Sequence, residues 1–331
     1  MSYRCFAALS TVIVVVLLSA VPVAAQTVPR TPWGQPDLQG IWDFRSITPL
    51  QRPEELADKE FLTEEEAARR EQEVVDRNEE LLNRPARRTA VTASVDRGED
   101  GAPGFYNNLW LDRGTTVVGT RRTSLVIDPP DGRIPSLTPA AQKRVAARAA
   151  LNRRITEGPE DRSLSERCIL RGNAGPPMTP GGYNNNVQLF QTPGYLAIFT
   201  EQIHDARIVP MNGRPHLPQH LRQWMGDSRG RWEGETLVIE TTNFSDKAYF
   251  RGAGEGMHLI ERFTRVDEDT LNYEFTVSDP QSFSKPWTAH IPMRKSLDPI
   301  YEYACHEGNY SMESTLRGAR AIEKRAKAES R

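Results

Sequence analysis

The stretch L-N-Y-E-F-T-V, residues 271 to 277, decides the fold class because its side chains alternate between apolar and polar. A period of two is typical of a β-strand that has one face in the core and the other outside it. The stretch W-T-A-H-I-P-M, residues 287 to 293, repeats the pattern. Glu274 and His290 stand on the polar faces, and parity alone leaves open whether those faces line an interior cavity or meet water.

Short runs of the same kind surround these two strands, separated by turn signals such as T-P-G, N-G and D-E-D. They predict about eight antiparallel strands, at residues 187–191, 195–203, 206–211, 236–242, 257–266, 271–277, 287–293 and 300–305. This spacing is typical of a meander that closes into a barrel or sandwich. We therefore predict a mainly β, antiparallel, calycin-like or lipocalin-like barrel or sandwich, and a small barrel has room for one small ligand.

Peripheral helices are predicted on both sides of this strand-rich region. Thr63 is a good N-cap for a charged helix over residues 63–83, and Thr138 followed by proline opens a second helix over residues 138–154. A third charged helix is predicted over residues 311–329, near the end of the chain.

The segments between these helices predict shorter elements. Residues 38–44 indicate a short strand, and residues 124–137 indicate a hairpin that turns at D-P-P-D-G. Residues 86–104 contain almost nothing to bury and indicate a mobile loop. We expect one domain over residues 26–331, with helical decoration in residues 54–160.

The N-terminus predicts the compartment. Arg4 supplies a positive charge, residues 5–20 are apolar, and V-A-A at residues 23–25 fits cleavage of a signal peptide after Ala25. The apolar run is shorter than the ~20 residues that a bilayer-spanning helix needs. We therefore expect a periplasmic or secreted protein without a stable membrane anchor.

The charge balance excludes one class of partner. Removal of the signal takes away one of the 42 basic residues and none of the 44 acidic ones, which leaves a net charge of −3. Binding to nucleic acid needs a clustered basic excess, so we predict no nucleic-acid partner. The sequence leaves the oligomeric state open.

The motif Y-A-C-H-E-G-N-Y, residues 303 to 310, places three reactive side chains next to one another. On a strand Cys305 and Glu307 share one face and His306 takes the other, so the three cannot point at one site. Two mature cysteines in an oxidising compartment favour pairing. We therefore predict a disulfide between Cys168 and Cys305, worth ~4 kcal/mol or more by loop entropy.

Several motifs carry a resemblance to known proteins. G-I-W at residues 40–42 resembles the Gly-x-Trp of the lipocalin or calycin superfamily, whose barrels bind hydrophobic small molecules. P-W-G-Q-P-D-L-Q-G-I-W, H-D-A-R-I-V-P-M-N-G-R-P-H-L-P, D-S-R-G-R-W-E-G-E-T-L-V-I-E-T-T-N-F and Y-A-C-H-E-G-N-Y together resemble a family of uncharacterised exported bacterial proteins. That resemblance implies export and a shared β-rich fold, and it carries no catalytic residue over to this chain.

The segment E-Q-I-H-D-A-R, residues 201 to 207, sets His204 beside Asp205. The pair suits acid/base chemistry because histidine titrates near neutrality. The alternative interpretation is a strand end with exposed charges, in which Asp205 pairs with Arg207 on the surface. We also predict that His204 and His290 lie within reach of one small molecule. The catalytic candidates are His204, Asp205, Glu274, His290 and His306.

Polar loops supply the candidates for substrate binding. Arginines in D-S-R-G-R-W-E suit carboxylates, and asparagines in Y-N-N-N suit hydroxyl groups, although turns need the same residues. His216 and His220 are four residues apart, but two nearby prolines disfavour a helix there, so we predict no metal site. The substrate-binding candidates are Asn185, Arg207, His216, Arg229, Trp232, Asn309 and Tyr310.

Two classes of function are compatible with these patterns. No serine nucleophile elbow, phosphate-binding glycine loop or dinucleotide fingerprint is present, so we predict no cofactor. The first class is an exported enzyme, a hydrolase, lyase or isomerase, that acts on a small molecule by acid/base chemistry in a barrel cavity. The second is a lipocalin-like carrier of a small hydrophobic or hydroxylated ligand. The many polar side chains in loops favour the enzyme.

Overall fold

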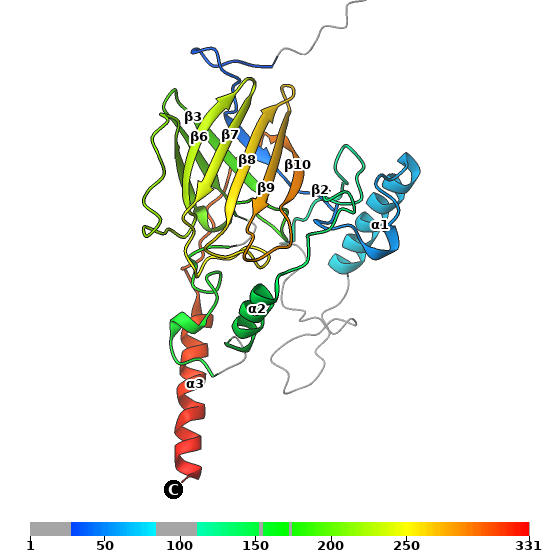
Figure 1. The fold of residues 1–331 in the computed structure, drawn as a ribbon. Helices are drawn as coiled ribbons and strands as arrows, with labels where there is room; N and C mark the ends of the chain where they lie inside the picture. The colour runs from blue at the N-terminus through cyan, green and yellow to red at the C-terminus, as the bar shows by residue number, and fades with distance from the viewer. Residues whose placement is uncertain (1–27, 84–110, 152–154, 172–173, 331) are drawn as a thin grey trace, which may run out of the picture.

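The computed structural model describes residues 28–83, 111–151, 155–171 and 174–330 (Figure 1). Within them the chain forms a ten-stranded antiparallel sheet with three helices at its periphery. The strands are β1 (Gly40–Asp43), β2 (Val126–Asp128), β3 (Asn186–Gln191), β4 (Tyr195–Thr200), β5 (Ala206–Pro210), β6 (Asp227–Glu233), β7 (Thr236–Thr242), β8 (His258–Arg265), β9 (Thr270–Ser278) and β10 (Trp287–Ser296). The predicted mainly β fold with peripheral helices is confirmed.

The sheet is not closed into a barrel. Its hydrogen-bonded order is β5-β4-β3-β1-β10-β9-β8-β7-β6, and β2 pairs with β10 beside this path. The two end strands β5 and β6 lie next to each other, and Gly230 of β6 faces Val209 and the side chain of Met211. A Cβ atom at Gly230 would lie 2.3 Å from Met211 Sδ, so a larger residue there would displace the Met211 side chain. Of the two predicted alternatives, the open arrangement is consistent with a β-sandwich.

One face of the strands holds the core, as the alternation predicts. Leu271, Tyr273, Phe275 and Val277 of β9 are fully buried, whereas the polar residues between them are half-buried on the outer face. Trp287 of β10 packs edge-to-face against Phe275, with ring centroids 5.6 Å apart. Glu274 and His290 therefore belong to the outer face, which answers the question that parity left open.

A charged pair lies inside this core. Arg207 of β5 donates two hydrogen bonds to Glu261 of β8, and the Tyr273 hydroxyl donates to Glu261 Oε1 at 2.7 Å. Burial alone would lower the pKa of Arg207, but the adjacent Glu261 carboxylate raises it, so the guanidinium stays charged. The Met178 amide donates to the Tyr273 hydroxyl at 3.1 Å, and so the loop that carries Met178 covers the end of the core. The inner face is filled by side chains where the sequence analysis expected a ligand cavity.

The helices agree with the sequence. α1 (Glu64–Asn83) begins at a capping box, in which the Glu66 amide donates to Thr63 Oγ1 at 3.2 Å and the Thr63 amide donates to Glu66 Oε2 at 2.8 Å. α2 (Pro139–Leu151) follows Thr138, whose Oγ1 accepts a hydrogen bond from the Ala141 amide. α3 (Tyr310–Glu329) ends the described chain and points away from the sheet (Figure 1). Three short 3-10 turns are η1 (Glu54–Leu56), η3 (Pro159–Asp161) and η4 (Gln202–His204).

Two strand predictions were wrong, and one strand was missed. Residues 300–305 pair with no strand, and the predicted hairpin over residues 124–137 does not form, since β2 pairs with β10 instead. The turn within it does form, with Gly132 at φ +70°. β6 was missed because D-S-R-G suggests a tight turn, whereas the structure continues it into a strand paired with β7. The predicted signal peptide and the loop over residues 86–104 lie outside the described residues.

Candidate functional site

The segment between β4 and β5 interrupts the predicted strand over residues 195–203. β4 ends at Thr200, and the turn η4 reverses the chain before β5 begins at Ala206. Ile203 and His204 both adopt the left-handed conformation, at φ +63° and +47°. For a β-branched residue this conformation is a true outlier, and each such residue costs ~1–3 kcal/mol. His204 and Asp205 therefore lie at a turn and not within a strand.

Hydrogen bonds and burial hold this strained turn in place. The Thr200 amide donates to the Asp205 carbonyl at 2.9 Å, which closes the turn. Thr200 Oγ1 lies 3.3 Å from the same carbonyl, and the Ile203 side chain is buried. Strained backbone conformations that the surrounding structure holds in place are common at functional sites. The turn is consequently a candidate for a site rather than a plain connection.

Asp205 is the unusual group of the turn. Its Oδ2 atom is buried and has no hydrogen-bond partner among the described residues. Burial raises the pKa of the Asp205 carboxyl from 3.8 to about 6, and the positive charge that His204 can carry only partly opposes this shift. The alternative surface pair with Arg207 does not form, since Arg207 is committed to Glu261 in the core. Asp205 therefore holds a carboxyl that exchanges its proton near neutral pH.

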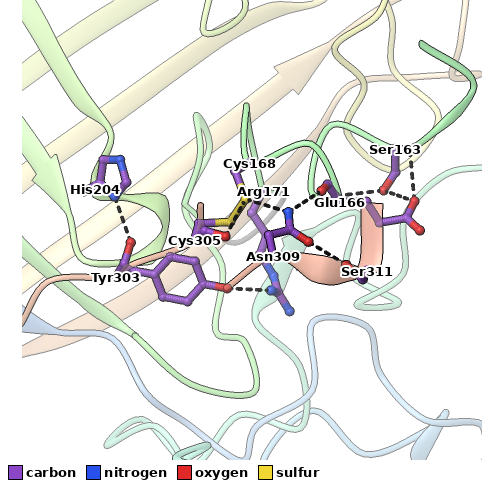
Figure 2. The surroundings of a disulfide bond; sticks show 9 residues. All are labelled: Ser163, Glu166, Cys168, Arg171, His204, Tyr303, Cys305, Asn309 and Ser311. Carbon is purple, nitrogen blue, oxygen red and sulfur yellow. Dashed lines mark hydrogen bonds between the residues drawn. A yellow bond between two sulfur atoms is a disulfide. The ribbon is translucent and has the colours of Figure 1, made fainter. Parts of the chain in front are cut away.

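The C-terminal segment contacts the turn at His204, as Figure 2 shows. His204 Nδ1 lies 2.9 Å from the Tyr303 carbonyl oxygen, which accepts only if Nδ1 carries the proton. A neutral His204 then leaves Nε2 as a bare acceptor on an exposed side chain. The contact therefore sets the tautomer in which His204 accepts a proton.

Two further side chains pack around the Tyr303 ring. Tyr303 stacks on Tyr183 with ring centroids 6.3 Å apart, and Arg171 Nη1 donates to the Tyr303 hydroxyl at 3.3 Å. Arg171 also lies over the Tyr183 ring at 5.0 Å. Burial and a hydrogen bond with Tyr183 raise the pKa of Tyr303, so its hydroxyl stays protonated. The Asp205 site is defined here as His204, Asp205 and Tyr303, whose ring Arg171 and Tyr183 hold in place.

The disulfide fixes the C-terminal segment beside this site. Cys168 and Cys305 are bonded, with their Cα atoms 5.8 Å apart, as the cysteine count predicted. Asn309 Nδ2 donates to the Glu166 carbonyl at 3.2 Å, which ties the same two segments together a second time (Figure 2). Position 303 thus keeps its contact with the turn although it is far away in sequence.

The other predicted catalytic residues lie elsewhere. Glu274 and His290 face each other across β9 and β10 on the outer face, in a groove that His204 does not line. β3 and β1 lie between β4 and β10, so the predicted approach of His204 and His290 is not observed. Burial and the charge of Arg122 lower the pKa of His290. His306 is exposed in the turn after the disulfide.

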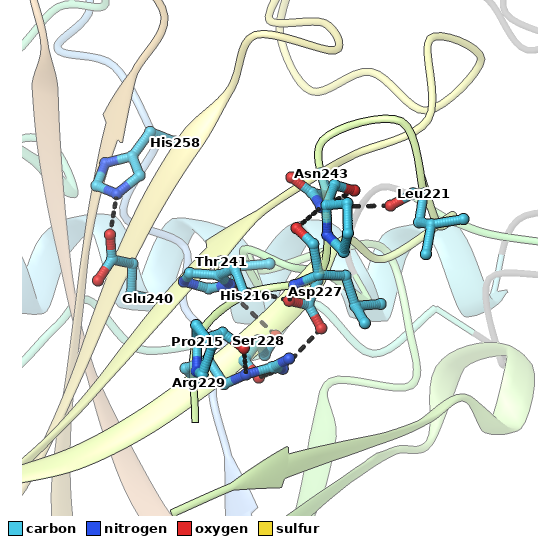
Figure 3. A network of polar contacts seen from close by, with 12 residues as sticks. Pro215, His216, Leu221, Asp227, Ser228, Arg229, Glu240, Thr241, Asn243 and His258 are labelled. Carbon is cyan, nitrogen blue, oxygen red and sulfur yellow. Dashed lines mark hydrogen bonds and ion pairs between the residues drawn. The ribbon is translucent and has the colours of Figure 1, made fainter. Parts of the chain in front are cut away.

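Two substrate-binding candidates hold a loop against β6. His216 Nδ1 lies 3.0 Å from Asp227 Oδ2, and Arg229 donates to Asp227 Oδ1 at 2.6 Å (Figure 3). Burial alone would raise the pKa of Asp227, but hydrogen bonds from the Leu217 amide, His216 and Arg229 lower it. Asn243 donates to the Leu217 carbonyl at 2.9 Å and secures the same loop. These contacts satisfy the polar groups within the protein.

The remaining candidates serve the fold in the same way. Asn185 is buried and closes its loop, with the Gly181 amide donating to Oδ1 and Nδ2 donating to the Asp112 carbonyl. Trp232 packs against the core, and Asn309 precedes α3, whose first residue Tyr310 is exposed. The sequence analysis missed Arg171, Tyr183 and Tyr303. The two tyrosines stand inside the quoted motifs Y-N-N-N and Y-A-C-H, but nothing in their spacing indicates that they stack.

The described residues contain no group of three or more histidine, cysteine or acidic side chains arranged to bind a metal ion. They also contain no helix long and apolar enough to cross a membrane. The chain matches no protein-family model, no curated protein and no solved structure.

Proposed function

We propose that the protein is an enzyme that acts on a small molecule by acid/base chemistry at the Asp205 site, without a cofactor. The observation that carries the proposal is the Asp205 carboxyl, whose buried Oδ2 atom has no partner among the described residues and whose pKa is raised to about 6. A general acid or base works best when its pKa lies near the working pH. Perturbed carboxyl groups of this kind are concentrated at active sites.

The neighbouring side chains have complementary roles in this proposal. Asp205 removes a proton from the substrate or returns one to it, and Nε2 of His204 is a second acceptor at the exposed side of the turn. This combination suits hydrolysis, elimination or isomerisation of a molecule that carries a carbonyl group.

The location differs from the one expected from the sequence. The reaction is placed at the end of the sheet beside the disulfide rather than in a barrel cavity, because aromatic side chains and the Arg207–Glu261 pair fill the inner face. A carrier with an interior ligand is less well supported for the same reason. Export, inferred from residues 1–25, remains part of the proposal and agrees with a disulfide.

Asp205→Asn is expected to lower kcat/KM by about 10²–10⁴-fold, the usual contribution of a positioned acid or base. The measurement is turnover of a panel of small esters, lactones, β-hydroxy acids and epimerisable hydroxy ketones by the purified protein. Asp298→Asn is the matched control, because Asp298 is an exposed carboxylate at the far end of β10. Its rate is expected to equal that of the wild type.

Two outcomes count against the proposal. The first is a wild-type rate in Asp205→Asn on a substrate that the wild type turns over. The second is a wild-type protein that turns over no compound class of the panel. Circular dichroism of both variants shows whether a loss of activity comes from the missing carboxylate or from unfolding of the variant.

A further inference from the structure

The outer face of the sheet carries a polar groove that the Asp205 site does not use. It has a volume of about 290 Å³ and lies across β6 to β10. Its lining consists of Glu233, Thr236, Arg262, Thr264, Asn272, Glu274 and His290. Ligand pockets measure ~300–1,000 Å³, so this groove suits a small molecule.

Strand register brings the key side chains into two adjacent rows. Arg262 of β8 stands opposite Glu274 of β9, which stands opposite His290 of β10. Asn272 lies two residues before Glu274 on the same face, opposite Thr264. Directly opposed residues have Cβ atoms ~4.5–5.5 Å apart, so one small molecule can contact both rows.

Four of the seven polar side chains that line the groove have no protein partner. The side chains of Arg262, Asn272, Glu274 and His290 make no hydrogen bond or ion pair with any residue that the structure describes. The other three lining residues have partners: Glu233 pairs with Arg231 at 2.7 Å, and the hydroxyl groups of Thr236 and Thr264 lie 2.8 Å apart. Four neighbouring polar groups without partners, gathered in one hollow, are arranged to bind something other than the protein itself.

The charges define the chemistry of the ligand. Arg262 presents a planar guanidinium, which binds a carboxylate through two parallel hydrogen bonds. Glu274 beside it accepts hydrogen bonds, and its charge repels a second anionic group. A ligand therefore needs a carboxylate and, close to it, a donor.

We propose that this groove binds a small carboxylic acid that carries an amine or a hydroxyl group on the neighbouring carbon. Arg262 receives the carboxylate, Glu274 accepts from the amine or hydroxyl, and Asn272 and His290 complete the contacts. The proposal is independent of the Asp205 site, with which the groove shares no residue, so failure of one leaves the other unaffected.

The test is titration calorimetry of the full mature protein with four compounds. Serine and lactate carry the amine and the hydroxyl, acetate lacks both, and glycerol lacks the carboxylate. Saturable binding of serine, lactate or both is expected, at least tenfold tighter than acetate and glycerol. Serine alone indicates an α-amino acid, and lactate alone indicates an α-hydroxy acid. Equal binding of acetate or glycerol, or no saturable binding of any compound, overturns the proposal.

Variants locate the binding. Arg262→Gln is expected to weaken it at least tenfold, and Arg262→Lys is expected to weaken it to a smaller extent because lysine keeps the charge and loses the paired donors. Glu274→Gln is expected to weaken serine more than lactate, because only serine brings a positive charge. Arg294→Gln, an exposed arginine of β10 that does not line the groove, is the matched control. Wild-type affinity in Arg262→Gln, or equal weakening in Arg294→Gln, overturns the assignment.

Discussion

Replacing Glu261 by glutamine is expected to lower the free energy of unfolding by about 3–5 kcal/mol, because it leaves the Arg207 guanidinium charged and unpaired in the core. Both side chains are buried, at 8% and 0% exposure, and the Tyr273 hydroxyl depends on the same carboxylate. The measurement is urea unfolding of wild type and variant near pH 7, analysed by linear extrapolation.

The matched control is Glu233→Gln, at the Arg231–Glu233 pair of the outer surface. There the side chains are 53% and 46% exposed, and water screens the interaction. Its loss is expected to cost less than about 1 kcal/mol. A double variant, Arg207→Met with Glu261→Leu, is expected to cost less than Glu261→Gln alone, because it leaves no unpaired charge. Equal costs for Glu261→Gln and Glu233→Gln would show that the buried pair is not held as described.

Loss of the disulfide is the second large effect. Cys168 and Cys305 are 137 residues apart in sequence, so Cys305→Ser is expected to lower the free energy of unfolding by about 4–5 kcal/mol by chain-entropy arithmetic. The variant also frees the segment that holds Tyr303 against His204, so the Asp205 site is expected to lose order along with stability. The measurement is urea unfolding of the variant and of the wild type.

Reduction of the wild type provides the control for this prediction. Dithiothreitol is expected to lower wild-type stability to that of Cys305→Ser and to leave the variant unchanged. Intact mass after alkylation, with and without reductant, reports the state of the two thiols. Two freely alkylated thiols in the purified native protein are incompatible with this account.

The sequence predicts the fold best where apolar and polar residues alternate along a strand, because each residue then belongs to a known face of the sheet. In residues 271–277 and 287–293, burial follows the alternation residue by residue, because each side chain has a core side or an outer side. β6 escaped because D-S-R-G suggests a tight turn and Gly230 contributes no side chain to an alternating pattern. Residues 300–305 were predicted as a strand, but pairing with another strand is a property of the fold and not of the segment.

The candidate site was predicted in part for a similar reason. The adjacency of His204 and Asp205 is visible in the sequence, and their residue types suggest acid/base chemistry. The contact of His204 with Tyr303 joins residues 99 apart in sequence, and the left-handed turn at Ile203 and the buried, unpaired Oδ2 atom of Asp205 exist only in the folded chain. No local pattern encodes such contacts, and therefore Glu274 and His290 were grouped with Asp205 although two strands separate β10 from β4.

The raised pKa of Asp205 has a consequence for stability. The folded protein holds this proton up to about pH 6, whereas a free aspartate releases it near 3.8. As the pH rises, Asp205 ionises in the unfolded chain before it ionises in the folded protein, which stabilises the unfolded state. The free energy of unfolding therefore falls as the pH rises from about 4 to above 6. Partial solvent exposure limits this loss to about 1–2 kcal/mol. The free energy of unfolding of Asp205→Asn is expected not to fall over this pH range, so the variant is expected to be more stable than the wild type at pH 7. A functional group that lowers stability behaves in this way.

The most direct measurement is the titration of the Asp205 carboxyl carbon by NMR in protein with labelled aspartate, assigned by the signal that disappears in Asp205→Asn. The account predicts a midpoint near pH 6, well above the ordinary aspartate value of 3.8. A midpoint near pH 4 would contradict it, because Asp205 would then be an ordinary ionised carboxylate at neutral pH.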